Sequence, residues 1–354
     1  MNPEIQEKIP TPMAESLAWS QKSPQSPLSP LSPQRQRGFT LVEMLLASSV
    51  LLVLMGILFS VLNQASGMWR TAAARLDTFQ GARRGFDTLT TLLSQATLNT
   101  YWDYDDPLAP TRYIRKSELR FECGPTSGVL SGANANAFPA HGVFFHAPAG
   151  VAGNAYQGLE GLLNVCGFYV QWSDDSAWLP AHVANANSRE RFRLMAWVEP
   201  TEELKTYEDS DEWIDNAAIT GMAGGTHVIA DNILAVLIWP RENGQTTGVS
   251  PVHMADRYTY DSYWTSGAQT IESNQLPPVL EVAMVAIDET SAQRLGDELQ
   301  SSVNGCFEGL FTGSPSSNFA EDLKLLEQNL IGIGVNYRVF STAIPMKESK
   351  WSLQ

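Results

Sequence analysis

One carboxylate, Glu43, lies near the start of a long apolar run, and two basic residues, Arg35 and Arg37, precede that run. A charged side chain within a membrane-spanning helix costs about 2.5 to 3.5 kcal/mol on insertion scales. Glu43 is therefore either a functional group with a charged partner or a side chain shallow enough to reach the lipid headgroups. Its position alone does not separate these two interpretations.

The rest of the chain has no recognisable catalytic constellation. The histidines of "HGVFFH", His141 and His146, lack the helical spacing and the glutamate of a zinc-protease motif. On a strand their side chains would point to opposite faces. The glycine-rich "GMAGGT" lacks the lysine of a phosphate-binding loop, and no GxSxG occurs. The sequence therefore predicts a protein that is not an enzyme and holds no cofactor or metal.

Three acidic clusters leave one alternative open, which is a bound calcium ion. They lie at residues 103–107, 173–176 and 208–215 and offer the hard oxygen ligands that calcium prefers. None follows the spacing of an EF-hand loop, so a solvated acidic surface is the expected state.

The three cysteines, Cys123, Cys166 and Cys306, are too few and too far apart for a disulfide framework, and none belongs to a CxxC pair. At most one disulfide can form within the chain. A bridge between Cys123 and Cys166, if the body lies outside the cytoplasm, and isolated buried thiols both remain open.

Composition limits the possible partners. The net charge of −15 argues against a nucleic-acid partner, because phosphate binding needs lysine and arginine massed on one face. With 354 residues, 44% of them hydrophobic, the chain can bury the core of one large domain or two smaller ones.

The apolar run predicts a membrane anchor. Residues 1–34 are rich in Pro, Ser and Gln and predict an extended or disordered tail. From Met44 to Leu62 no charge occurs, and about 20 apolar residues span a bilayer. An ordinary secretory signal is the alternative, but its apolar core is shorter, and Asn63 occupies a position where cleavage needs a small residue.

A long helix is expected to continue beyond the anchor. Apolar residues recur at spacings of three, four and seven, at Trp69, Leu76, Phe79, Phe86, Leu89 and Leu93. We therefore predict one helix over 39–98, half in lipid and half packed on a soluble body. Gly81 and Gly85 weaken it by up to about 1 kcal/mol each.

Beyond residue 98 the pattern predicts strands, two short helices and glycine-rich loops, hence an α+β head over 99–346 and a short tail over 347–354. Several runs alternate apolar and polar residues, as in a half-exposed antiparallel sheet. Serine or threonine is placed to cap both helices. The expected strands are 119–123, 142–148, 164–172, 191–200, 227–240, 276–288 and 334–345, and the expected helices are 290–303 and 317–330.

The segment "RGFTLVE" resembles the class III leader junction of type IV pilins and type II secretion pseudopilins. The resemblance implies that a prepilin peptidase cuts between Gly38 and Phe39, removes residues 1–38 as a leader and methylates the new amino-terminal Phe39. Arg35 and Arg37 would be the basic cytoplasmic flank. Glu43 would be the fifth mature residue and would serve assembly.

The chemistry of this junction can be stated on its own. Before cleavage the nitrogen of Phe39 belongs to an uncharged amide, and afterwards it is an ammonium group. Phe39 and Glu43 are four residues apart on a helix and could pair within one chain, or the amine of an adjacent subunit could pair with Glu43. In a low dielectric an unpaired charge is penalised heavily, so a pair between subunits would favour assembly.

The resemblance also implies partners and a location. The partners would be prepilin peptidase, other pilin or pseudopilin subunits, the inner-membrane assembly platform and inner-membrane lipid. The chain would cross the inner membrane once, with its leader in the cytoplasm and its head in the periplasm, or outside the cell in an assembled filament.

Two departures from the family concern the type of subunit. Ser60 stands where many major pilins have a proline that kinks the helix, and the leader is unusually long unless translation starts at Met13. The large head is more similar to minor subunits, the J-class pseudopilins and W-class pilins. Residues 276–295 and 334–352 are similar to a group of prepilin-like proteins called Verru/Chthon cassette protein C.

Three functions are then distinguishable. The first is a minor pilin or pseudopilin subunit that joins or primes a type IV pilus or type II secretion pseudopilus. The second is an adhesive or ligand-binding head on a pilin-type anchor, with the aromatics of "YTYDSYWT" (258–265) as its surface. The third is a membrane-tethered enzyme, which no recognisable set of catalytic residues supports.

Overall fold

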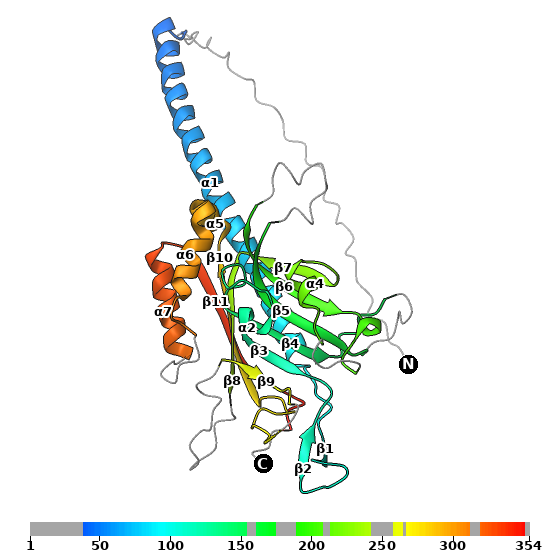
Figure 1. Ribbon diagram of the computed structural model, residues 1–354. Coiled ribbons are helices and arrows are strands. Elements are labelled where there is room, and N and C mark those ends of the chain that lie inside the picture. Colours follow the sequence, from blue (N-terminus) through cyan, green and yellow to red (C-terminus); the bar gives the residue numbers. More distant parts are fainter. Residues whose placement is uncertain are drawn as a thin grey trace, which may run out of the picture. The chain divides into compact units, whose positions relative to one another are not determined.

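A 53-residue helix, α1 (Leu41–Leu93), begins the described part of the chain in the computed structural model (Figure 1). The structure describes residues 38–153, 161–174, 189–207, 213–241, 258–264, 267–311 and 319–350. By its internal contacts the chain divides into two compact units, residues 1–62 and 63–354, and α1 crosses that boundary.

Helix α1 ends five residues before the predicted end at Leu98. The Ser94 amide still donates to the Thr90 carbonyl at 3.0 Å, but the Thr97 amide donates to the carbonyl of His146 on a neighbouring strand at 2.9 Å. The backbone therefore joins a sheet where the sequence pattern still allowed a helix, because a tertiary hydrogen bond replaces a helical one.

The last turns of α1 pack into the head. Phe86, Leu89 and Leu93 are buried, as their spacing predicts, whereas Trp69 is 78% exposed. A Cβ atom at Gly85 would lie 3.2 to 3.3 Å from side-chain atoms of residues 194, 229 and 230. Glycine at this position therefore lets the helix approach the sheet closely, which offsets its low helix propensity.

The largest sheet has six antiparallel strands in the order β7-β6-β5-β4-β3-β9 (Figure 1). Its strands are β3 (Phe121–Pro125), β4 (His141–Ala147), β5 (Asn164–Ser173), β6 (Arg191–Glu199), β7 (Thr226–Asp231) and β9 (Tyr260–Asp261).

Two smaller antiparallel sheets complete the strands. The three-stranded sheet has the order β11-β10-β8 and the other is a hairpin, β1-β2. Their strands are β8 (Ile233–Arg241), β10 (Val279–Ile287), β11 (Tyr337–Pro345), β1 (Tyr101–Tyr104) and β2 (Tyr113–Lys116). The predicted α+β class, with a long apolar helix followed by a mainly antiparallel head, is confirmed.

Short helices flank these sheets, and α5, α6 and α7 lie together beside the three-stranded sheet (Figure 1). The α-helices are α2 (Thr126–Val129), α4 (Asn216–Thr220), α5 (Glu289–Leu295), α6 (Leu299–Phe307) and α7 (Phe319–Gly332), and the 3-10 helices are η1 (Thr201–Glu203) and η2 (Gly296–Glu298).

The middle of the six-stranded sheet is buried on both faces, not half-exposed as predicted. Val143 and Phe145 of β4 join a core shared with α1, the three-stranded sheet, α6 and α7. Phe144, between them, joins a second core with Tyr169 and Trp213. Apolar side chains therefore cover both faces of β4, whereas a strand in a half-exposed sheet alternates apolar and polar residues.

Three local predictions need correction. The predicted strand 227–240 is two strands, because Asn232 takes a φ of 59° and turns the chain between β7 and β8. The predicted helix 290–303 is divided at Gly296, where φ is 50°. The cap of α5 is Asp288, whose carboxylate accepts from the Ser291 amide at 2.8 Å, and not a serine or threonine.

The proposed Cys123–Cys166 disulfide does not form in this fold. All three cysteines are free and buried. Cys123 lies on β3 and Cys166 on β5, with β4 between them. Strands two positions apart are separated by roughly 9.5 Å, beyond the Cα separation of about 7 Å that a disulfide allows.

The close packing of the second core can be tested at Gly167, which lies opposite Phe144 in the sheet register. A Cβ atom there would overlap the Phe144 ring. We expect Gly167→Ala to destabilise the full chain in detergent by about 1 to 3 kcal/mol, measured by thermal or denaturant unfolding.

Gly128→Ala is the matched control, because a Cβ atom there meets nothing within 4 Å. In a Phe144→Leu background the cost of Gly167→Ala should shrink, since the two changes share one contact. Equal stability of Gly167→Ala and Gly128→Ala would contradict this account of the packing.

Candidate functional site

The start of α1 holds the residues predicted for processing and assembly. Gly38 and Phe39 are exposed and precede the first helical residue. Arg35 and Arg37 lie outside the described residues. The predicted cut between Gly38 and Phe39 therefore falls in exposed, non-helical backbone, which is the conformation a peptidase needs.

Glu43 takes part in a capping box with Thr40. Its Oε2 accepts hydrogen bonds from the Thr40 amide at 2.9 Å and from the Thr40 hydroxyl at 2.9 Å. The Glu43 amide in turn donates to the Thr40 hydroxyl oxygen at 3.3 Å. This reciprocal pattern satisfies donors that a helix start leaves open. The sequence signal Thr-x-x-Glu could have predicted it.

The capping box does not depend on processing. A cut between Gly38 and Phe39 leaves the amide and the hydroxyl of Thr40 unchanged. In the uncut chain the nitrogen of Phe39 is a peptide nitrogen, so the pairing of its ammonium group with Glu43 stays a prediction.

Glu43 shares one side of α1 with apolar residues. It lines a shallow apolar surface together with residues spaced three and four apart along the helix: Leu46, Ala47, Val50, Leu51 and Leu54. The stretch Leu41–Arg70 is long and apolar enough to cross a membrane. Its residues from Leu41 to Leu62 are exposed, as lipid or a neighbouring helix would require.

Comparison with known proteins gives one match. Residues 33–59 match the family model of the prokaryotic N-terminal methylation motif. The chain carries a prepilin-type, class III signal. No curated protein and no solved structure matches the chain.

The match covers the junction and most of the apolar helix of this prepilin-type chain. It supports a type IV pilin-like or pseudopilin-like subunit in general, with processing by prepilin peptidase and contacts to pilin-family subunits. The apolar helix suggests a membrane anchor. The match ends at residue 59, so the head lies outside it.

His141 and His146 of the prepilin-type head lie on opposite faces of β4, as the strand spacing predicts. The Nδ1 atom of His141 lies 3.0 Å from both the amide nitrogen and the carbonyl oxygen of Ile238 on β8. His146 stacks on Trp213, and its Nε2 lies 2.8 Å from the Thr206 hydroxyl. Burial lowers the pKa of each imidazole to about 4, so both are neutral structural groups at pH 7.

The first acidic cluster is used in local hydrogen bonds. The carboxylate of Asp105 accepts from the Thr111 hydroxyl and from the amides of Thr111 and Arg112, and the Thr111 hydroxyl bond holds the pKa of Asp105 well below its usual range. Asp103 pairs with Lys116 at 2.8 Å.

Calcium binding stays an open alternative to the expected solvated acidic surface. Within the described residues no group of three or more His, Cys, Asp and Glu side chains is placed to hold a metal. Parts of the other two clusters, residues 175–176 and 208–212, lie outside the described residues.

Only part of "YTYDSYWT" could form the predicted surface, because Tyr263 and Trp264 are half-buried. Tyr258 and Tyr260 are buried in the core. Exposed aromatics do lie on the hairpin β1-β2, where Trp102, Tyr104 and Tyr113 are 54, 43 and 62% exposed. Their strand positions and the Tyr104–Tyr113 register place them on one face. The sequence predicted no strand over residues 101–116, so it missed this face.

A charged cluster lies between β3 and β9. The Arg120 guanidinium contacts Glu122 at 2.9 Å and Asp261 at 2.7 Å, and it lies over the rings of Trp213 and Tyr263. One cation thus serves two carboxylates. Burial raises the pKa of Glu122 to about 7, since the attraction of the shared Arg120 only partly opposes it and the charge of Asp261 adds to it.

Glu122 should make stability depend on pH. Because its folded pKa of about 7 exceeds its unfolded value of about 4.3, its contribution is present in full below the unfolded value and is lost as pH rises through 7. Relative to the wild type, the free energy of unfolding of Glu122→Gln should rise by up to about 3 kcal/mol from pH 5 to pH 8. Denaturant unfolding at each pH measures this difference.

The exposed Glu321 offers the control, because Glu321→Gln should leave the pH profile of the wild type unchanged. A pH-independent difference between Glu122→Gln and wild type would contradict the prediction.

Proposed function

We propose that the chain is a minor, non-enzymatic pilin-like or pseudopilin-like subunit. Prepilin peptidase cuts it after Gly38 and Phe39 is N-methylated. The mature protein then joins or primes a type IV pilus or a type II secretion pseudopilus. The observation that carries this proposal is the methylation motif over residues 33–59, which ends in a helix long and apolar enough to cross a membrane.

Cleavage changes the electrostatics at the start of α1. It converts the amide nitrogen of Phe39 into an ammonium group, four residues before Glu43. The Oε2 atom of Glu43 already accepts two hydrogen bonds from Thr40. Since a carboxylate can accept about four hydrogen bonds, capacity remains for an ammonium group, from the same chain or from a neighbour.

The apolar side of α1 suits a neighbouring helix. Glu43 lies on it beside Leu46, Ala47 and Val50, at the spacing by which helices pack. In lipid such a face gains little from hydrophobicity, because the acyl chains are equally apolar. An ammonium–carboxylate pair at its end would then decide which axial offset between subunits is favoured.

The assignment to a minor subunit rests on the head. The described residues of the head alone form three sheets and five short α-helices, a large structure that suits a subunit present in few copies. The segments similar to Verru/Chthon cassette protein C contain β10 and β11, which pair along their whole length. That similarity therefore falls on one structural unit, and we include it in the proposal.

Processing is tested by mass spectrometry of the protein isolated from its native membrane. We expect a mature chain that begins at N-methyl-Phe39. An intact leader, or a cut after Ala65 by signal peptidase, would contradict the proposal.

Assembly is tested with Glu43→Ala and Thr40→Val. Glu43→Ala removes the charge, so we expect loss of incorporation into filaments, measured by shearing and immunoblotting, while the head folds normally. Thr40→Val removes only the capping hydroxyl, which lowers helix stability by about 1 kcal/mol, so incorporation should persist. Full incorporation of Glu43→Ala would overturn the assembly role.

The exposed hairpin β1-β2 favours a second function, an adhesive head. Its charges are compensated locally, with Lys116 on Asp103 at 2.8 Å and Arg112 near Asp105 at 3.9 Å. Trp102, Tyr104 and Tyr113 form an exposed aromatic face. Arg115, opposite Trp102, shares this face but is 3% exposed and donates to the carbonyls of Ser273 and Thr270. Such a face suits the apolar side of a neutral sugar ring, so the partner we favour is a polysaccharide.

For the adhesive function we expect Trp102→Ala combined with Tyr113→Ala to abolish retention of the full chain on insoluble cellulose or chitin, with filament incorporation unchanged. Tyr207→Ala, at a tyrosine that is 66% exposed on another loop, is the control. Equal retention of the double variant and the wild type would exclude the hairpin as a sugar-binding face.

A further inference from the structure

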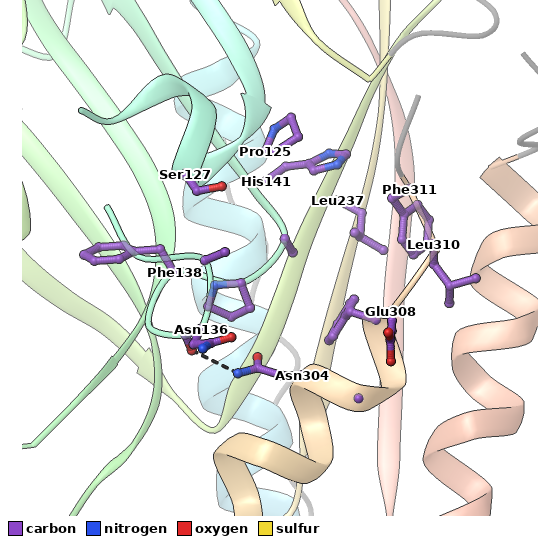
Figure 2. A pocket seen from close by; sticks show the side chains of 15 residues that line it. Pro125, Ser127, Asn136, Phe138, His141, Leu237, Asn304, Glu308, Leu310 and Phe311 are labelled. Carbon is purple, nitrogen blue, oxygen red and sulfur yellow. Dashed lines mark hydrogen bonds between the residues drawn. The ribbon is translucent and has the colours of Figure 1, made fainter. Parts of the chain in front are cut away.

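A cavity of about 510 Å³ lies between the segment before β4, strand β8 and helix α6 (Figure 2). Its walls are mostly apolar. They include Phe138, Pro139, Leu237, Phe307, Leu310 and Phe311. Sites for small organic ligands are typically mostly apolar and of about 300 to 1,000 Å³, so both size and lining fit such a ligand.

The floor of the cavity is fixed by His141. This side chain is 1% exposed, and its Nδ1 is held 3.0 Å from the backbone of Ile238 on β8. The rings of His141 and Phe311 meet edge to face, with centroids 6.3 Å apart. The imidazole thus joins the two sheets and cannot rotate to fill the space above it.

Two residues of the lining hold unfavourable backbone conformations. Ala140 has a φ of 61° and Phe311 a φ of 53°, and each such residue costs about 1 to 3 kcal/mol. Hydrogen bonds hold them there. The Ala140 carbonyl accepts from the Thr126 amide at 2.9 Å, and the Phe311 amide donates to Asp322 at 3.1 Å. These bonds fix the backbone of both lining residues.

Helix α6 forms the opposite wall without entering the cavity. The side-chain amide of Asn304 donates to the Asn136 carbonyl at 3.2 Å (Figure 2). That of Gln300 donates to the same carbonyl at 3.0 Å, and the two bonds fix α6 to the segment before β4. A Cβ atom on Gly305 would meet nothing within 4 Å. Gly305 therefore leaves space that a larger side chain would fill.

The charge at the rim selects the ligand. Among the described residues that line the cavity, Glu308 is the one with a charged side chain at pH 7. It follows the last residue of α6, where the helix dipole adds partial negative charge. Asn304 and Ser127 add hydrogen-bonding groups to the rim (Figure 2).

We propose that this cavity binds a small amphipathic cation, with an aromatic or branched apolar body against the apolar lining of Pro139, Leu237 and Phe307 and an ammonium or amidinium end at Glu308. The site lies wholly in the head and is independent of processing and assembly at α1. The head then senses or carries a small basic ligand in addition to any filament role.

The probe is 4-(trifluoromethyl)benzylamine, followed by fluorine NMR with the full chain in lipid nanodiscs and with empty nanodiscs as the blank. We expect its resonance to broaden with the protein, whereas 4-(trifluoromethyl)benzoate, of the same size and opposite charge, should not broaden. Gly305→Leu should abolish the broadening by filling the cavity. Glu308→Gln should weaken binding about twofold to fivefold, as for an exposed ion pair.

Gly332→Leu is the matched control, because a Cβ atom at Gly332 also meets nothing within 4 Å and Gly332 ends α7 outside the cavity lining. Thermal unfolding of each variant checks that the head is folded. No broadening of the amine, equal broadening of the benzoate, or binding that survives Gly305→Leu would each overturn the proposal. Glu308 is exposed, so Glu308→Gln should leave the fold intact. This variant therefore tests the charge even if Gly305→Leu fails to fold.

Discussion

Both faces of the six-stranded sheet must be covered, and α1 covers part of one of them. Phe86, Leu89 and Leu93 enter the same core as the strands and the three-stranded sheet. The helix that carries the methylation motif is therefore also a core element of the head. Burying one such leucine contributes about 1.5 to 3 kcal/mol, so the head depends on the last turns of α1 for its stability.

Glu43 can serve two states of the chain because it has more acceptor capacity than either state uses. Before processing, Thr40 supplies two donors to its Oε2 atom, which lowers the cost of placing a carboxylate at the start of an apolar helix. Under the proposed function, processing would place an ammonium group four residues away. The capping box uses groups of Thr40 that the cut leaves unchanged, so processing would add a partner without rebuilding the helix start.

The sequence predicted the elements whose residues report directly on local conformation. The runs that became β4, β5, β6 and β10 are rich in β-branched and aromatic residues, and the strands follow them within a few residues. The division at Asn232 and the one at Gly296 depend on single positive-φ residues, which a pattern averaged over ten residues does not register. The end of α1 was missed because a tertiary hydrogen bond from Thr97 decides it.

The site residues also divide into those that the local sequence identifies and those that tertiary contacts decide. Glu43 was identifiable because a carboxylate in an apolar run stands out in one dimension. The relation of Cys123 to Cys166 depends on β4 lying between their strands, and the burial of Tyr258 depends on which loop faces the core. The cavity at His141 depends on contacts between residues 97 positions apart, which no local spacing contains.

His141 links the fold to that cavity because it bonds to the backbone at the edge of a sheet. Strand β8 ends the three-stranded sheet, so its outer edge presents backbone groups that no strand of that sheet pairs. The imidazole Nδ1 meets the backbone of Ile238 at this edge. A neutral ring is required, because a charged one would have two donors and could not accept from the Ile238 amide. Burial, which lowers the pKa of His141 to about 4, supplies that neutrality. A side chain, and not a fourth strand, thus closes the edge of the three-stranded sheet and leaves the space beside it open.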